Sequence, residues 1–465
     1  MNGRGGALIP AHQVVERGIA ASSGDGCAVI VHDGSETDLR FAVNTVTTNG
    51  IRRYRSVTVI SFLNKGEGTA VGIASASGSV DVEDLLRAAE SDASRADPAD
   101  DASPLIVGAA AFDFEDAPVL TEPEVLHPVL SKLGGAFDRA RSSDRVLAGF
   151  AEHAITTTYL GTSTGTRLRH VQPTGKIEFV ARDSAGQRSA WTGLGTKDFS
   201  DVDLDVAEAR LVQRLGWAAK QIEMPAGRYE VVLPPDAVAD LVLMLGEATS
   251  GKEAEEGRSV FSAPGGGTKV GESLSGTPFD LRSDPAEAGI ECLPFVSSVV
   301  STEDRSVFDN GLRIEPTFWL KEGRLDRLRY HRAGAAKSKQ PVTPPIDNLV
   351  LEVPGADGSL DSMIGSSDRA LLLTCLWYIR EVDPSTLLLT GLTRDGVYLV
   401  EKGEIVGAVN NFRFNESPID LLRKTTEVGR AQRCISREWN EYFNRTKMPP
   451  LRVEGFNMSS VSPAT

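Results

Sequence analysis

The sequence lacks any apolar run long enough to cross a membrane as a helix, which takes about 18 residues or more. Its first ten residues also lack the longer apolar core of a secretory signal. Clusters of basic residues are missing as well, so the chain offers no typical surface for the phosphate backbone of a nucleic acid. We therefore expect a cytoplasmic protein that binds neither membranes nor nucleic acid.

Cysteine and histidine are both scarce and scattered. The four cysteines, at positions 27, 292, 375 and 434, contain no Cys-x-x-Cys pair, so we expect reduced thiols and no disulfide framework. The six histidines stand at positions 12, 32, 127, 153, 170 and 331, and no two of them have the spacing of metal ligands. Both observations predict that this chain has no metal site of its own.

Acidic residues, in contrast, are abundant. The formal net charge is −15, from 49 Lys or Arg against 64 Asp or Glu. Much of this excess lies in residues 81–124, where 13 acidic residues stand against Arg87 and Arg95 alone. Such a segment is typical of solvated surface, and it does not by itself indicate a site.

The N-terminal half reads as two successive α+β regions, residues 1–110 and 111–225. In the first, a helix near 11–21 precedes strands at 27–32, 39–46, 57–63 and 71–76, with turns expected at Asp33-Gly34 and Asn49-Gly50. A helix at 81–90 and a flexible connection at 91–104 follow. In the second, we expect helices at 125–141 and 203–222 around strands at 154–160, 166–171, 176–181 and 187–192.

Residues 226–465 form the third region, which is rich in short strands and carries one central helix. Pro234 and Pro235 precede an apolar stretch that repeats Val238, Leu241 and Val242 at helical spacing. Apolar residues on its other faces predict that this helix is buried. The expected fold class is therefore α+β, with an N-terminal antiparallel sheet and a β-rich C-terminal domain around a buried helix.

A second marked stretch runs from residue 390 to 420. Residues 397–400 and 405–409 read as a strand pair, with Gly403 in the turn between them. Ser417 and Pro418 are typical of the cap and first residue of a helix. Polar residues gather on either side of these strands, where they could face a cleft, namely Arg394, Asp395, Asn410, Asn411 and Arg413.

This stretch resembles the C-terminal hallmark of the TldD/PmbA family of metallopeptidases. Residues 308–311 and 449–456 resemble that family's Phe-Asp-x-Glu-Gly turn and its last strand, and residues 39–50 resemble its early sheet. In the catalytic TldD-type subunit, the buried helix carries His-Glu-x-x-x-His, whose histidines bind zinc. The same frame here reads Gly246-Glu247-Ala-Thr-Ser-Gly251, so both histidine positions are glycine.

The resemblance implies a metal-free, TldE-type (PmbA-type) subunit. Zinc needs side-chain donors, and glycine has none. The family's zinc-binding cysteine lies in a Cys-Gly turn, whereas Cys434 is followed by isoleucine. Zinc would then belong to a homologous TldD-like partner subunit, unfolded or leader peptides would be the substrate, and Glu247 would serve a structural role more readily than a catalytic one.

Two other classes of function stay open. One is an independent hydrolase with an unrecognised site. The other is a stand-alone interaction protein, for example a modulator of a DNA-associated enzyme. Recovery of a zinc-bearing homologue in a pull-down would separate the peptidase subunit from both.

Overall fold

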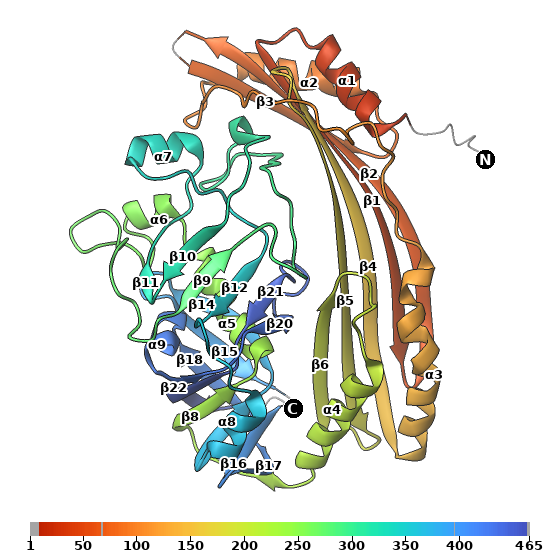
Figure 1. The fold of residues 1–465 in the computed structure, drawn as a ribbon, viewed down its shortest axis with the longest axis vertical. Coiled ribbons are helices and arrows are strands. Elements are labelled where there is room, and N and C mark those ends of the chain that lie inside the picture. Colours follow the sequence, from red (N-terminus) through yellow and green to blue (C-terminus); the bar gives the residue numbers. More distant parts are fainter. Residues whose placement is uncertain (1–8, 67, 395, 463–465) are drawn as a thin grey trace.

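A long curved sheet and a β-rich body lie side by side in the molecule (Figure 1). The computed structural model describes residues 9–66, 68–394 and 396–462. The N-terminal part forms the antiparallel sheet, and the C-terminal part forms the β-rich body around one buried helix. The expected α+β fold class is confirmed.

The N-terminal sheet has six strands in the order β3-β2-β1-β4-β5-β6. Because β1 pairs with both β2 and β4, the strands before and after residue 110 belong to one sheet. The strands are β1 (Gly26–Ala42), β2 (Thr45–Lys65), β3 (Gly68–Ser77), β4 (Arg145–Thr162), β5 (Arg167–Asp183) and β6 (Ser189–Thr196). The helices of this part are α1 (Ala11–Ala21), α2 (Val82–Arg95), the 3-10 turn η1 (Pro123–Leu126), α3 (His127–Ser142) and α4 (Leu204–Trp217).

The turns expected at Asp33-Gly34 and Asn49-Gly50 are wrong, because both pairs lie inside long strands. The carboxylate of Asp33 accepts two hydrogen bonds at 2.5 Å from buried Arg55 on the neighbouring strand, so its charge is neutralised inside the sheet. Gly34 gives space to Tyr54, whose ring would lie 2.0 Å from an added Cβ. The chain instead turns after residue 42, between β1 and β2. Likewise, the strands expected at 166–171 and 176–181 are one strand, β5.

Two further boundaries differ from expectation. Helix α2 continues to Arg95, so part of the connection expected to be flexible is helical. Beyond it, the carboxylate of Asp101 accepts a hydrogen bond from Ser301 at 2.6 Å, which ties this segment to the C-terminal body. Helix α4 ends at Trp217, and residues 221–222 enter the C-terminal sheet as a short strand.

The C-terminal body contains two sheets. The larger has ten strands, β14-β15-β18-β22-β8-β13-β16-β17-β7 with β19 paired to β22, and the smaller runs β11-β10-β9-β12-β21-β20. Their bounds are β7 (Gln221–Ile222), β8 (Gly227–Leu233), β9 (Asp280–Ser283), β10 (Thr317–Lys321), β11 (Arg324–Leu325), β12 (Leu349–Glu352), β13 (Arg369–Leu373), β14 (Leu376–Asp383), β15 (Leu388–Thr393), β16 (Val397–Glu401), β17 (Glu404–Val409), β18 (Phe412–Glu416), β19 (Thr425–Val428), β20 (Gln432–Cys434), β21 (Thr446–Met448) and β22 (Leu451–Val461). The helical elements are α5 (Pro235–Glu247), α6 (Gly251–Glu255), the 3-10 turn η2 (Val307–Asp309), α7 (Arg332–Ser338), α8 (Leu360–Ser366) and α9 (Pro418–Arg423).

Helix α5 is the centre of this body. It contacts β8 and β14 of the larger sheet and β20 and β21 of the smaller one. Seven of its eight residues from Pro235 to Val242 are buried, so the apolar stretch of the sequence forms a deeply buried helix, as predicted. The strand pair β16–β17 and the helix after Pro418 are also confirmed, with Gly403 at φ +80°. Ser417 does not cap that helix; its hydroxyl donates to the carbonyl of Thr386.

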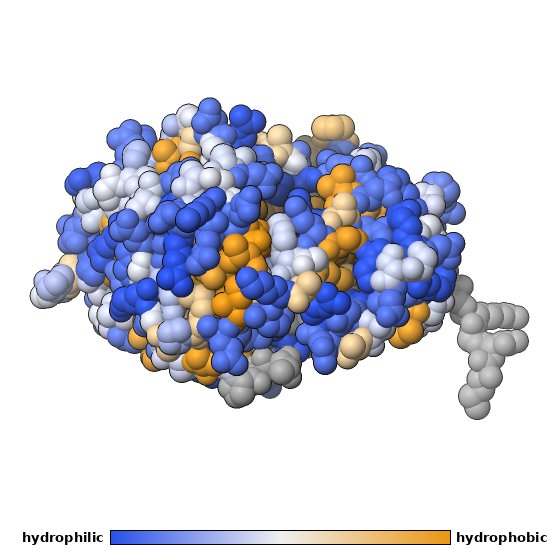
Figure 2. Space-filling model, turned by 90° about the horizontal axis from the view of Figure 1, so that it is seen from below, coloured by the Kyte–Doolittle hydropathy of each residue, from blue (hydrophilic) through white to orange (hydrophobic). Residues whose placement is uncertain are grey.

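The sheet and the body meet through aromatic and polar contacts. Phe62 of β2 packs on Phe308 with ring centroids 4.9 Å apart. The guanidinium of Arg437 lies 5.0 Å from the ring centroid of Trp191 on β6 and 4.6 Å from that of Trp377 on β14. Seen from the end where α4 and β17 lie, the surface is mainly hydrophilic, with apolar residues gathered towards the middle (Figure 2). Among the described residues, no helix is long and apolar enough to cross a membrane.

Candidate functional site

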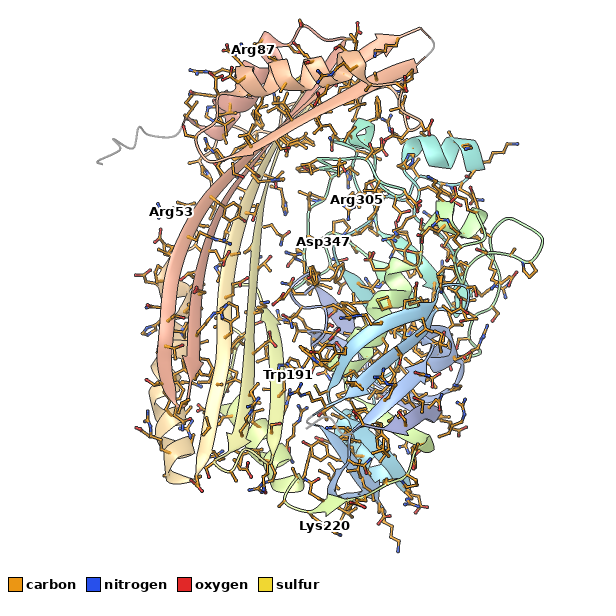
Figure 3. The ribbon with its side chains drawn as sticks, turned by 180° about the vertical axis from the view of Figure 1, so that it is seen from behind. Arg53, Arg87, Trp191, Lys220, Arg305 and Asp347 are labelled. Carbon is orange, nitrogen blue, oxygen red and sulfur yellow. The ribbon has the colours of Figure 1, made fainter. Side chains whose placement is uncertain are left out.

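The end of helix α5 opens onto a charged cleft in the C-terminal body. The cleft measures about 330 Å³, and its lining includes Gly246 and Glu247 from the helix end. Across from them lie charged residues of neighbouring loops, Asp304, Arg305 and Asp347. Arg305 and Asp347 lie on the side of the body that faces the N-terminal sheet (Figure 3).

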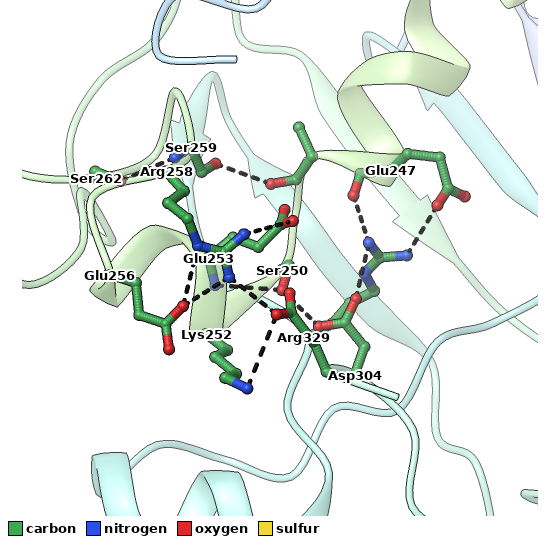
Figure 4. Close-up of polar contacts among 12 residues, drawn as sticks. Glu247, Ser250, Lys252, Glu253, Glu256, Arg258, Ser259, Ser262, Asp304 and Arg329 are labelled. Atoms are coloured by element: carbon green, nitrogen blue, oxygen red, sulfur yellow. Dashed lines mark hydrogen bonds and ion pairs between the residues drawn. The ribbon is translucent and has the colours of Figure 1, made fainter. Parts of the chain in front are cut away.

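A single guanidinium, that of Arg329, ties the helix end to the opposite loop (Figure 4). It donates to the backbone carbonyl of Glu247, lies 3.4 Å from the Glu247 carboxylate, and pairs with Asp304 at 3.0 Å. The Arg329 side chain is 12% exposed, whereas that of Glu247 is 65% exposed. A protein cation therefore stands beside Glu247, and water reaches most of its carboxylate.

The chain between α5 and α6 is fixed by the same loop. The backbone N–H of Arg329 donates to the carbonyl of Thr249, and the N–H of Gly251 donates to the carbonyl of Arg329. The hydroxyl of Ser250 donates to Asp304 at 2.7 Å. It also accepts the N–H of Glu253, and this bond caps the start of α6. Instead of one continuous helix, two helices meet at Thr249 and Ser250, and residues 246–251 are held from both sides.

The two glycines of the motif leave no room or donor for a metal. A Cβ on Gly251 would lie 2.1 Å from the ring of Tyr330, whose hydroxyl donates to Glu255 at 2.8 Å. A Cβ on Gly246 would lie 3.1 Å from Leu349. The residues present therefore do not fit zinc, because the space of the second histidine is filled by Tyr330 and glycine offers no ligand atom. Within the described ranges, no group of three or more His, Cys, Asp or Glu could hold a metal ion.

An acidic residue of α5 that the sequence analysis missed, Asp240, is buried on another face of the helix. It is 1% exposed, and its Oδ1 accepts hydrogen bonds from the Ser436 hydroxyl at 2.6 Å and the Glu438 N–H at 3.0 Å. Its Oδ2 has no hydrogen-bond partner among the described residues. Burial raises the pKa of Asp240 to about 7. An acid inside an apolar helix pattern was the signal that could have pointed to it.

Cys434 lies apart from the Glu247 cleft, on β20. It is 5% exposed, and its Sγ lies 3.4 Å from the hydroxyl of Thr446. Burial raises the pKa of this thiol well above its usual range, so it is a poor nucleophile and a poor metal ligand.

The other polar candidates do not join Glu247, since none of the described ones lines its cleft. The side-chain oxygen of Asn410 accepts the N–H of Met224 at 2.7 Å, which fixes the chain next to β7. Arg413 is exposed on β18, while Arg394 and Asn411 are half-buried. Asp395 lies outside the described residues.

Known proteins share this architecture. Residues 226–460, half of the chain, match the PmbA/TldA metallopeptidase C-terminal domain. TldE from Thermococcus kodakarensis superposes with a TM-score of 0.76 at 16% identity, covering 96% of this chain and 98% of its own. A putative modulator of a DNA gyrase from Thermotoga maritima has a TM-score of 0.76 at 17% identity and 96% and 99% coverage. Another from Bacteroides thetaiotaomicron has a TM-score of 0.74 at 14% identity and 97% and 98% coverage. No curated protein matches the sequence.

Proposed function

The chain belongs to the TldD/PmbA family of metallopeptidase-like proteins, and we propose that it is the non-catalytic, TldE-like subunit of a cytoplasmic two-component peptidase. The observation that carries the proposal is at the motif itself. Gly246 and Gly251 supply no ligand, Tyr330 fills the space beside Gly251, and Arg329 pairs with the remaining acid, Glu247. A zinc-bearing homologous subunit would then supply both the metal and the base.

The role proposed for this chain is to help enclose the site and to hold unfolded or leader peptides. An extended peptide binds through backbone hydrogen bonds, which makes recognition tolerant of sequence. Of the polar candidates that the structure describes, Arg413 is the most accessible, whereas Asn410 already uses its side-chain oxygen within the chain. Arg394, Asp395 and Asn411 complete the set proposed to meet the peptide.

The direct test measures zinc and cleavage together. The isolated chain is expected to carry well under one zinc per molecule and to leave an unstructured peptide intact. Mixed with a homologue that carries His-Glu-x-x-x-His, it is expected to support cleavage that a chelator abolishes. Stoichiometric zinc that survives mild chelation, or chelator-sensitive cleavage by the isolated chain, would overturn the proposal.

A pull-down separates this function from the alternatives. Two structural relatives are described as putative modulators of DNA gyrase, which keeps a role beside a DNA-associated enzyme as the second candidate. Recovery of the zinc-bearing homologue with the tagged chain supports the peptidase subunit. Recovery of gyrase subunits without that homologue would favour the second candidate.

A further inference from the structure

A large cavity lies between helix α4 and the C-terminal body, away from the Glu247 cleft. It measures about 750 Å³, a size typical of sites for small molecules and short peptides. It is bounded by α4 and β6 of the N-terminal part and by α8, β20 and the start of α5. Figure 3 shows Trp191, beside this region, on the side of the sheet that faces the C-terminal body.

One face of α4 presents two arginines to this cavity. Arg210, Gln213, Arg214 and Trp217 follow the i, i+3, i+4, i+7 spacing of a single helix face, and all four line the cavity. The opposite face of α4, with Leu204, is buried against the N-terminal sheet. The helix therefore holds its polar face rigidly towards the cavity.

The two guanidiniums lack acidic partners in the described part of the chain. Arg214 is 5% exposed and is not ion-paired there; its Nη1 donates to the backbone carbonyl of Trp191 at 2.5 Å. Arg210 is exposed and makes no hydrogen bond or ion pair within the same described ranges. Burial is the main cause that lowers the pKa of Arg214; the charge of Arg210 adds to it, whereas Tyr398 and Asp236 act in the opposite direction. A buried cation without a carboxylate at ion-pair distance is costly, and a bound anion would offset that cost.

The opposite wall of the cavity carries the complementary group. Asp236, in the first turn of α5, lines the cavity, and one of its oxygens accepts the N–H of Ile435 at 3.2 Å. It lies beyond ion-pair distance from both arginines in the described structure. The space between them therefore has cations at one wall and a carboxylate at the other.

We propose that this cavity binds a short peptide or amino acid with a free carboxylate, held by Arg210 and Arg214, with its ammonium or N–H groups directed to Asp236. The planar guanidinium forms paired hydrogen bonds with a carboxylate, which suits this end of such a ligand. Trp217 and Leu360 provide apolar lining for side chains. Because the proposed binding needs no partner subunit, it can be tested independently of the proposed peptidase role.

The test uses the isolated full-length chain and calorimetric titration with trialanine, its C-terminal amide, and inorganic phosphate. Trialanine is expected to bind, and its amide to bind at least about tenfold more weakly, because the amide removes the anion that the arginines recognise. Arg210→Gln is expected to weaken trialanine binding by about the same factor. The matched control is Arg17→Gln, since Arg17 is an exposed helix arginine of α1 outside this cavity.

Arg210 is the informative position because it is exposed, so its substitution leaves the fold intact; a thermal unfolding curve verifies this for each variant. Equal binding of trialanine and its amide, or no trialanine binding by the folded chain, would overturn the proposal. Binding of phosphate alone would also overturn it, because the site would then recognise a different anion. Loss of trialanine binding in Arg210→Gln but not in Arg17→Gln supports it.

Discussion

At the scale of single residues, the surroundings of Gly251 leave no space for a side chain. Its backbone begins α6 in an ordinary conformation, so alanine would be acceptable to the helix itself. The obstacle is the Tyr330 ring, because three of its atoms would lie 2.1, 2.3 and 2.5 Å from an added Cβ. The family's histidine could not simply be restored here without moving Tyr330.

We expect Gly251→Ala to lower the free energy of unfolding by about 1–3 kcal/mol, the usual cost of overpacking a filled site. The matched control is Gly276→Ala, because an added Cβ there meets nothing within 4 Å and the backbone is not left-handed. That control is expected to be neutral or slightly stabilising. Urea unfolding measures the free energy of unfolding of both variants. Equal values would show that the Tyr330 ring moves aside at little cost.

Glu247→Gln tests the other motif residue in the complex with a zinc-bearing partner. We expect turnover of a peptide to fall less than about tenfold. Loss of a true general base would instead lower turnover by a factor of roughly 10²–10⁴. The reason is structural: Arg329 also holds the Glu247 backbone carbonyl, which the substitution leaves in place. Glu256→Gln, at the exposed end of α6, is the control for assembly. A drop of about a hundredfold or more with normal assembly would make Glu247 catalytic.

At the scale of elements, α5 combines an apolar helix with one buried acid, and that acid predicts a pH dependence. The ordinary pKa of an aspartic acid is 3.8, and in the folded chain the pKa of Asp240 is about 7. Between these two values the folded chain keeps a proton that the unfolded chain has released. The contribution of Asp240 to stability therefore falls as pH rises from about 4 to about 7, and it changes no further above that range.

Asp240→Asn removes this titration while keeping an oxygen that can accept from Ser436 and Glu438. The stability of the variant relative to the natural chain is expected to increase steadily from pH 4 to pH 7 and then to level off. Chemical unfolding at several pH values measures this difference directly. Asp97→Asn, at an exposed position outside α5, serves as the matched control. A flat difference for Asp240→Asn would refute the raised pKa.

Elements were predictable from sequence where local chemistry and tertiary structure agree. The apolar period of α5 and the turn at Gly403 needed no distant partner, and both are confirmed. Asp33-Gly34 has the residues of a turn, but its conformation depends on Arg55 and Tyr54, which lie on the next strand. For the candidate site, the helix end was visible in the sequence, whereas Arg329 comes from a loop 82 residues away and carries no motif.

At the scale of the whole molecule, the β-rich body packs on the N-terminal sheet through a shared apolar cluster and through long-range polar contacts. Boundaries near residues 110 and 225 stay predictions; the first falls between strands of one sheet, and the family match starts just after the second. Lys176 of β5 donates to Asn440 at 2.9 Å, and Arg437 reaches between Trp191 and Trp377. The cavity of Arg210 lies along the same junction, so its geometry depends on how the two parts are held together.

Arg437→Ala tests that dependence. The guanidinium contacts one indole ring from each part and lies 3.6 Å from Glu178 of the sheet, and its side chain is 17% exposed. Two partly desolvated cation–π contacts are worth on the order of 2 kcal/mol together, so we expect a loss of that size. Arg40→Ala is the matched control, because Arg40 lies 4.7 Å from the Phe150 ring centroid entirely within the N-terminal sheet.

The two variants are expected to differ in the form of unfolding as well as in its midpoint. If Arg437 couples the two parts, its loss should separate the transition seen by tryptophan fluorescence from that seen by far-UV circular dichroism, since coincident transitions are the mark of a single cooperative unit. Arg40→Ala should shift both transitions together. Coincident transitions in Arg437→Ala, with the midpoint of the natural chain, would mean that the remaining contacts, including Phe62 with Phe308, hold the parts together without it.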